Sequence, residues 1–184
     1  MNRKYLIDIA NSAILEELQQ KVLIDKRELL SRHPELRKKG AVFVTLELDK
    51  NLRGCIGSLT AHRTLLDDIV SNAKAAAFQD TRFRQLTQRE FDYDGFTIEI
   101  SLLSEPKRLH YRDADDLYKK IRPNIDGVVL QKDRYRGTYL PQVWEQLPRP
   151  DKFFASLCQK AGMRPNCLDF HPEIYTYKVE KIKE

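Results

Sequence analysis

The sequence is poor in cysteine, and its three cysteines have none of the spacings that build a disulfide framework. Cys55, Cys158 and Cys167 form no CxxC pair in a chain of 184 residues, whereas small disulfide-built domains carry many cysteines close together. Cys167 and His171 have the spacing of half a zinc site, but no second pair completes it. We therefore expect neither a disulfide framework nor a metal centre.

Long hydrophobic runs are also missing, and no stretch approaches the roughly 20 apolar residues that cross a bilayer. Asp8 follows the amino terminus too closely to leave room for the apolar core of a secretion signal. Hydrophobic residues nevertheless make up 41% of the chain and charged residues 32%, which suffices for a core with a well-solvated surface. These features predict a cytoplasmic protein without membrane association, folded as one domain over residues 1–184.

Charge of one sign is not concentrated in any part of the chain. The 32 basic and 27 acidic residues are interspersed, and the net charge is +5. Internal repeats, a Walker lysine, HExxH and Gly-x-Ser-x-Gly are absent too. A mildly basic, solvated surface accounts for this composition. Nucleic-acid or nucleotide binding therefore ranks last among the functions that we consider.

Helical and extended patterns follow one another without the strict rhythm of βαβ units. Apolar residues recur at helical spacing over residues 3–30, 64–78, 113–121 and 151–162, and a further helix begins at Pro141. Strand patterns cover residues 41–48, 52–56, 95–103, 127–131, 137–140 and 174–182. This mixture predicts an α+β fold, with a mixed sheet flanked by helices.

The stretch Leu52-Arg53-Gly54-Cys55-Ile56-Gly57 has the most distinctive composition in the chain. Cys55 is a candidate nucleophile, because a neighbouring cation such as Arg53, two residues away along a strand, favours the thiolate. The alternative is a small buried strand cysteine. Gly54 and Gly57 are binding candidates, since glycine lets a ligand or partner backbone approach closely. Their lone G-x-x-G spacing fits tight strand packing equally well.

Two charged residues outside this stretch are further binding candidates. Arg82, in Asp80-Thr81-Arg82-Phe83, is suited to holding a substrate anion. The alternative is a local clamp between Asp80 and Arg82, with Phe83 in the core. Glu99 shares a strand face with Thr97 and Ser101, where a carboxylate serves as acid, base or binding partner, or belongs to a solvated surface.

The six-residue stretch resembles the signature of the AMMECR family, and further matches follow in order along nearly the whole chain. They are Asp80–Phe83, Glu99–Leu103, Gly127–Leu130, Leu140–Trp144 and Cys158–Gly162. The resemblance implies a compact α+β fold of a larger and a smaller lobe, with the signature near the cleft between them. It also implies association with a Memo-type protein and a radical S-adenosylmethionine (radical-SAM) enzyme. It implies no established reaction, it leaves the cofactor of this chain unknown, and radical chemistry would belong to the partner.

Three hypotheses about function follow. In the first, the protein is a small enzyme or enzyme component that acts on a small molecule: Cys55 is the nucleophile or redox thiol, Arg53 and Arg82 hold an anionic substrate, and Glu99 orients it or transfers a proton. In the second, it is a non-catalytic adaptor for the Memo-type and radical-SAM partners. In the third, it binds nucleotides or nucleic acid.

Overall fold

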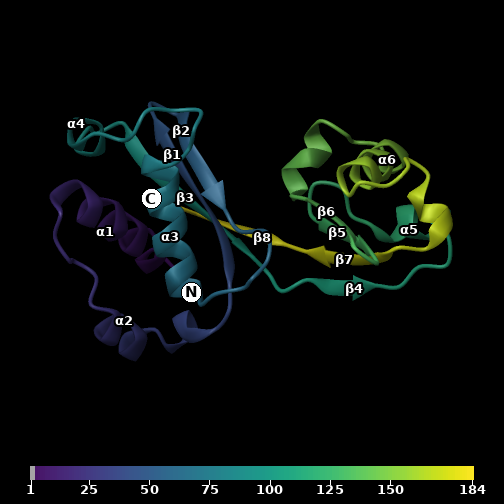
Figure 1. The fold of residues 1–184 in the computed structure, drawn as a ribbon, viewed down its shortest axis with the longest axis horizontal. Coiled ribbons are helices and arrows are strands. Elements are labelled where there is room, and N and C mark those ends of the chain that lie inside the picture. The colour runs from purple at the N-terminus through teal and green to yellow at the C-terminus, as the bar shows by residue number, and fades with distance from the viewer. Residues whose placement is uncertain (1–2) are drawn as a thin grey trace. The chain divides into compact units, whose positions relative to one another are not determined.

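Two compact units, each built on a four-stranded sheet, make up the protein (Figure 1). The structure is a computed structural model that describes residues 3–184. The first unit runs to Leu103 and is completed by Glu180–Glu184, while Ser104–Val179 form the second unit. Helices and strands are mixed in both, and the strands pair antiparallel. The α+β class expected from the sequence is therefore confirmed.

The first unit places its strands in the order β2-β1-β3-β8. These strands are β1 (Ala41–Leu48), β2 (Asn51–Gly57), β3 (Phe96–Leu103) and β8 (Val179–Lys183). Its helices are α1 (Tyr5–Gln19), α2 (Lys26–Arg32), α3 (Leu65–Phe78) and α4 (Gln88–Phe91), with a short 3₁₀ helix, η1 (Pro34–Arg37). Helices α1 and α3 pack on one face of the sheet, where the alternating apolar residues of β1 and β3 are buried. The opposite face carries Thr45, Glu99 and Ser101, as the alternation predicts.

The second unit has the strand order β4-β7-β5-β6. These strands are β4 (Lys107–Leu109), β5 (Gly127–Lys132), β6 (Tyr135–Tyr139) and β7 (Glu173–Tyr177). Its helices are α5 (Ala114–Lys120) and α6 (Pro150–Lys160), with 3₁₀ helices η2 (Pro141–Glu145) and η3 (Cys167–Phe170). The core centres on Trp144, which stacks on Phe153 at 3.6 Å between ring centroids and donates its indole N–H to the Asp126 carbonyl.

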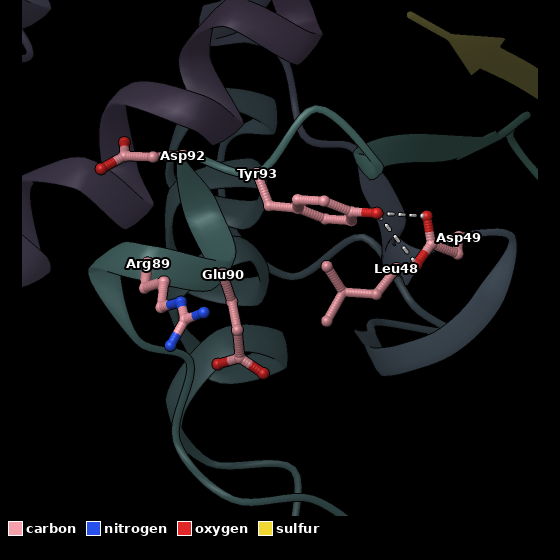
Figure 2. A pocket seen from close by; sticks show the side chains of 6 residues that line it. All are labelled: Leu48, Asp49, Arg89, Glu90, Asp92 and Tyr93. Carbon is pink, nitrogen blue, oxygen red and sulfur yellow. Dashed lines mark hydrogen bonds between the residues drawn. The ribbon is translucent and has the colours of Figure 1, made fainter.

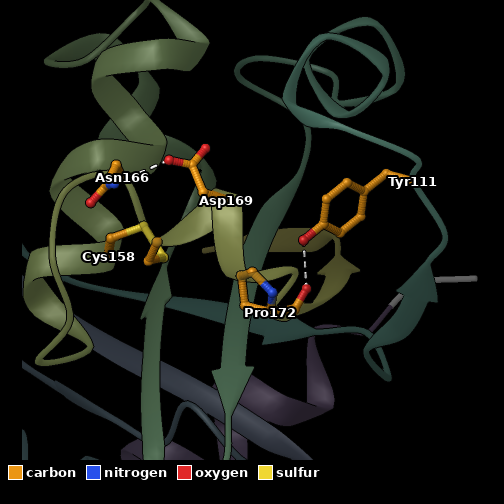
Figure 3. The surroundings of a disulfide bond; sticks show 6 residues. Tyr111, Cys158, Asn166, Asp169 and Pro172 are labelled. Atoms are coloured by element: carbon orange, nitrogen blue, oxygen red, sulfur yellow. Dashed lines mark hydrogen bonds between the residues drawn. A yellow bond between two sulfur atoms is a disulfide. The ribbon is translucent and has the colours of Figure 1, made fainter.

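A disulfide joins Cys158 of α6 to Cys167 of η3 (Figure 3). The sequence predicted no disulfide framework and did not indicate this single bond: the two residues are 9 apart in sequence, and the turn between α6 and η3 brings them together. The bond also removes the half zinc site, because the sulfur of Cys167 is used. Among residues 3–184, no group of three or more histidine, cysteine, aspartate or glutamate side chains is arranged to hold a metal.

Two stretches that carry a continuous pattern in the sequence are each divided in the structure. The helical pattern over residues 3–30 becomes α1 and α2, because Gln20 adopts a left-handed conformation and Asp25 caps a new helix. The last strand becomes β7 and β8, which belong to different sheets. In the part of the chain that the structure describes, no helix is both long and apolar enough to span a membrane.

Candidate functional site

Strand β2, which carries Arg53, Gly54, Cys55 and Gly57, lies at the edge of its sheet and contains a bulge. Leu46 of β1 pairs with Gly54, whereas the next residue, Glu47, pairs with Leu52, so Arg53 has no partner across the strands. A bulge redirects the side chains around it. The simple alternation that would place Arg53 and Cys55 on one face is therefore interrupted at this point.

Both glycines of the signature lie against other parts of the protein. A Cβ added at Gly54 would lie 2.2 Å from the carbonyl oxygen of Ala76 in α3. One added at Gly57 would lie 2.3 Å from Cγ of Phe43 on the neighbouring strand. These contacts account for both glycines as close-packing positions, without a ligand.

Arg53 is held by the segment that follows α3. Its Nε and Nη2 donate to the two carboxylate oxygens of Glu90, at 2.9 and 3.2 Å, and this pairing lowers the pKa of Glu90 to about 2. Nη2 also reaches the Gln85 carbonyl at 3.4 Å. Only 9% of Arg53 is exposed, and its buried Nη1 has no hydrogen-bond partner. Arg53 therefore fixes the α4 segment against β2, and its charge is neutralised.

The free edge of β2 at Cys55 is occupied by the side chains of Asp80 and Arg82. The Cys55 N–H donates to Asp80 Oδ2 at 2.9 Å, and Arg82 Nη2 donates to the Cys55 carbonyl at 3.2 Å. Arg82 also makes two bonds to Asp80, of 2.9 and 2.7 Å, and holds the pKa of Asp80 far below its usual range. This pair replaces the hydrogen bonds that a further strand would make. Phe83, which we expected in the core under this interpretation, is only half-buried, with Arg53 and Arg82 at 5.9 and 5.5 Å from its ring centre.

The Cys55 thiol is half-buried and is not part of a disulfide. Its Sγ lies 3.4 Å from Thr45 Oγ1, and Thr45 pairs with Cys55 on one side and with Glu99 on the other. Lys181 and Lys183 reach Glu99 at 3.2 and 2.9 Å. Burial acts to raise the pKa of Glu99, but the bonds from the two lysines outweigh it and lower the pKa. We call these five side chains the polar row, and it crosses the sheet on the face away from α1 and α3.

The structure thus separates the six predicted site residues into two groups. Arg53, Gly54, Gly57 and Arg82 hold β2 in place, whereas Cys55 and Glu99 lie in the polar row, with Thr45 between them. His62, the histidine that follows the signature most closely in sequence, has its Nδ1 2.9 Å from the Thr60 carbonyl oxygen.

Sequence reasoning missed Thr45, Glu90 and the two lysines of the polar row. The strand alternation pointed to Thr45, and Glu90 stands in the capping box Thr87–Glu90. Neither pattern shows which side chain the residue contacts: Thr45 contacts Cys55, and Glu90 binds Arg53. The lysines had no comparable signal, because they lie near the carboxyl end of the chain and reach Glu99 only when β8 joins the sheet.

A pocket of about 700 Å³ lies beside α4 and the β1–β2 turn (Figure 2). It is lined by Leu48, Asp49, Arg89, Glu90, Asp92 and Tyr93. The Tyr93 hydroxyl donates to the Asp49 carboxylate at 3.1 Å, and the Tyr93 ring is half-exposed. Glu90 connects this pocket to the signature, because it also holds Arg53.

Comparison with known proteins identifies the family. The model of the AMMECR1 family matches residues 7–182. The chain belongs to the AMMECR1 family. A Saccharolobus islandicus relative is 38% identical over 175 residues, covering 89% of this chain and 73% of its own length. A Methanothermobacter thermautotrophicus member of the family is 33% identical over 181 residues, covering 95% and 89%. The crystal structure of an uncharacterised Pyrococcus horikoshii protein superposes with a TM-score of 0.76 at 31% identity, covering 98% of this chain and 90% of that one.

Proposed function

We propose that this AMMECR1-family protein is a small enzyme, or a component of one, whose working group is the Cys55 thiol. One observation carries the proposal: the thiol belongs to the signature, is half-buried and is not used in a disulfide. The backbone N–H and carbonyl of Cys55 are bonded to Asp80 and Arg82. The thiol lies in a half-buried residue and shares a hydrogen bond with the Thr45 hydroxyl.

The surroundings of the thiol suit a reactive group. Its strand is fixed by Gly54, Asp80 and Arg82, so the backbone that carries the thiol is held in place, which favours a preorganised reactive group. The guanidinium of Arg82 lies at the same strand edge, with its Nη2 3.2 Å from the Cys55 carbonyl oxygen. Thr45 is placed to donate to a thiolate.

This proposal changes the roles of the other candidates. Arg53 and Arg82 are positioning residues, because Glu90 and Asp80 neutralise their charges. The negative charge of a substrate would instead be bound by the two lysines of the polar row, Lys181 and Lys183. Glu99 holds those lysines in place. The substrate is a small molecule handled in the cytoplasm, and the Memo-type and radical-SAM partners implied by the family resemblance would supply the metal and radical chemistry.

Alkylation of Cys55 by iodoacetamide tests this proposal. Because the other two cysteines form the disulfide, unreduced protein offers the Cys55 thiol alone. We expect the native protein to react faster at neutral pH than the same protein unfolded in urea, and Cys55→Ser to remove all labelling. Thr45→Val, which keeps the shape and removes the hydroxyl, should slow the native reaction and leave the unfolded one unchanged. A native rate that is below the unfolded rate and insensitive to Thr45→Val contradicts the proposal.

The adaptor function is the second candidate, and the pocket in Figure 2 favours it. Tyr93 is 50% exposed there, and Leu52, on the adjoining strand β2, is 45% exposed. Exposed tyrosines are typical anchors of protein interfaces, and an exposed leucine nearby adds apolar surface. If the protein is an adaptor, the double substitution of Tyr93 and Leu52 by serine should abolish binding of a purified Memo-type protein, and Cys55→Ser should not. If the protein is instead an enzyme that acts through the thiol, Cys55→Ser should abolish turnover, and the double substitution should leave turnover unchanged.

A further inference from the structure

A second pocket, of about 140 Å³, lies in the second unit, where β4 ends and β7 begins. It is lined by Arg108, Leu109, His110, Tyr111, His171, Pro172, Glu173 and Ile174. Strand β4 pairs with β7 through Leu109 and Ile174, so the residues that follow Leu109 lie beside those that precede Ile174. The pocket is thus formed by two chain segments that are far apart in sequence.

The walls of this pocket are held rigidly. The Tyr111 hydroxyl donates to the Pro172 carbonyl at 2.7 Å (Figure 3), and burial raises the pKa of Tyr111 to about 12, so the hydroxyl keeps its proton. The ring of His171 stacks on that of Tyr111, with centroids 6.2 Å apart. His171 has a φ of 48°, a left-handed conformation that ends η3. The disulfide at Cys167 ties η3 to α6 and so anchors this turn.

The polar groups of the lining are mostly free donors. The carboxylate in the lining, that of Glu173, is already bound on both oxygens, by Arg108 at 3.0 Å and by the Tyr175 hydroxyl at 3.1 Å. The imidazoles of His110 and His171 make no hydrogen bond to any of residues 3–184. Arg108 uses one nitrogen for Glu173, which leaves further N–H groups of its guanidinium available.

We propose that this pocket binds a small oxyanion of the phosphate or carboxylate class. Arg108 and the two imidazoles supply the donors, and the stacked rings of Tyr111 and His171 supply a flat wall. The volume of 140 Å³ is several times the roughly 30 Å³ that one water takes up in the liquid, so the pocket has room for a small oxyanion. A cation finds no free carboxylate here, because Arg108 and Tyr175 occupy Glu173.

This site is separate from the thiol chemistry proposed for Cys55, and its test does not depend on activity. The imidazole signals of the whole protein are followed by NMR while sodium phosphate or sodium acetate replaces sodium chloride at constant ionic strength. We expect saturable shifts of the His110 and His171 signals with at least one of the two oxyanions, and the anion that saturates identifies the class. The signals of His33 and His62, which lie in the first unit, should not move.

Substitutions separate binding from general salt effects. Arg108→Gln and His171→Asn should each weaken binding by about tenfold, and asparagine tolerates the left-handed conformation of residue 171. His110→Gln changes an exposed ring and serves if His171→Asn fails to fold. His62→Gln is the matched control and should leave the binding unchanged. The proposal is overturned if neither anion saturates the shifts, if all four histidines respond alike, or if Arg108→Gln binds as tightly as the parent protein.

Discussion

Replacing Gly54 by alanine should separate strand β2 from helix α3. The added Cβ would lie 2.2 Å from the carbonyl oxygen of Ala76, so the strand and the helix must move apart by close to an ångström. Overpacking of this kind costs about 1–3 kcal/mol, and the upper part of that range applies because the obstacle is backbone. Alanine stiffens the unfolded chain and returns about 0.4–1 kcal/mol. We expect a net loss of about 2 kcal/mol in the free energy of unfolding.

Urea unfolding followed by far-ultraviolet circular dichroism measures this loss. Cys55→Ala is the matched control on the next residue, and it should lower the free energy of unfolding by about 1 kcal/mol at most, because it removes one half-buried sulfur and its hydrogen bond to Thr45. Ala76→Gly provides a sharper check. It removes a methyl group but leaves the carbonyl oxygen in place, so it should not restore the stability that Gly54→Ala loses.

Two results would refute this reasoning about Gly54. One is a loss below about 0.5 kcal/mol, the scale of an ordinary surface substitution, which would mean that β2 does not press on α3. The other is rescue by Ala76→Gly, which would place the obstacle in a side chain. In either case the signature glycine would have to be explained by a ligand or a partner.

Three further predictions concern charge, covalent bonding and the strand edge. Glu90→Gln should lower the free energy of unfolding by about 2 kcal/mol at neutral pH, as loss of a charged hydrogen bond does. Arg53 lowers the folded-state pKa of Glu90 to about 2. The difference in stability between variant and parent should therefore be complete above the ordinary pKa of about 4.3 and should vanish as the pH falls toward 2. Reduction of the disulfide, or Cys158→Ser, should lower the free energy of unfolding by about 3 kcal/mol for so short a loop, and a melting temperature of Cys158→Ser that still responds to dithiothreitol would contradict this. Asp80→Ala should expose the Cys55 amide, so its hydrogen exchange should accelerate about tenfold without global unfolding, and unchanged exchange would show that Asp80 does not protect it.

The sequence by itself determined the class of the fold, the family and the location of the signature. Apolar residues at period two over 95–103 and at helical spacing over 64–78 predict β3 and α3, because those periods reflect which face an element can bury. The ordered motifs led to the family that the comparison confirmed over residues 7–182. Local patterns carry this information, since each depends on residues close together in the chain.

Only the tertiary structure decided what the signature residues do. The bulge at Arg53 depends on pairing with β1, and the disulfide depends on the turn between α6 and η3. Glu90, Asp80 and the lysines of the polar row lie far along the chain from the groups they hold, and a single sequence does not show which charges meet. Arg53 and Arg82 look like substrate-binding cations until their carboxylate partners are in place. The half-exposed thiol of Cys55 is what remains free once those pairs have formed.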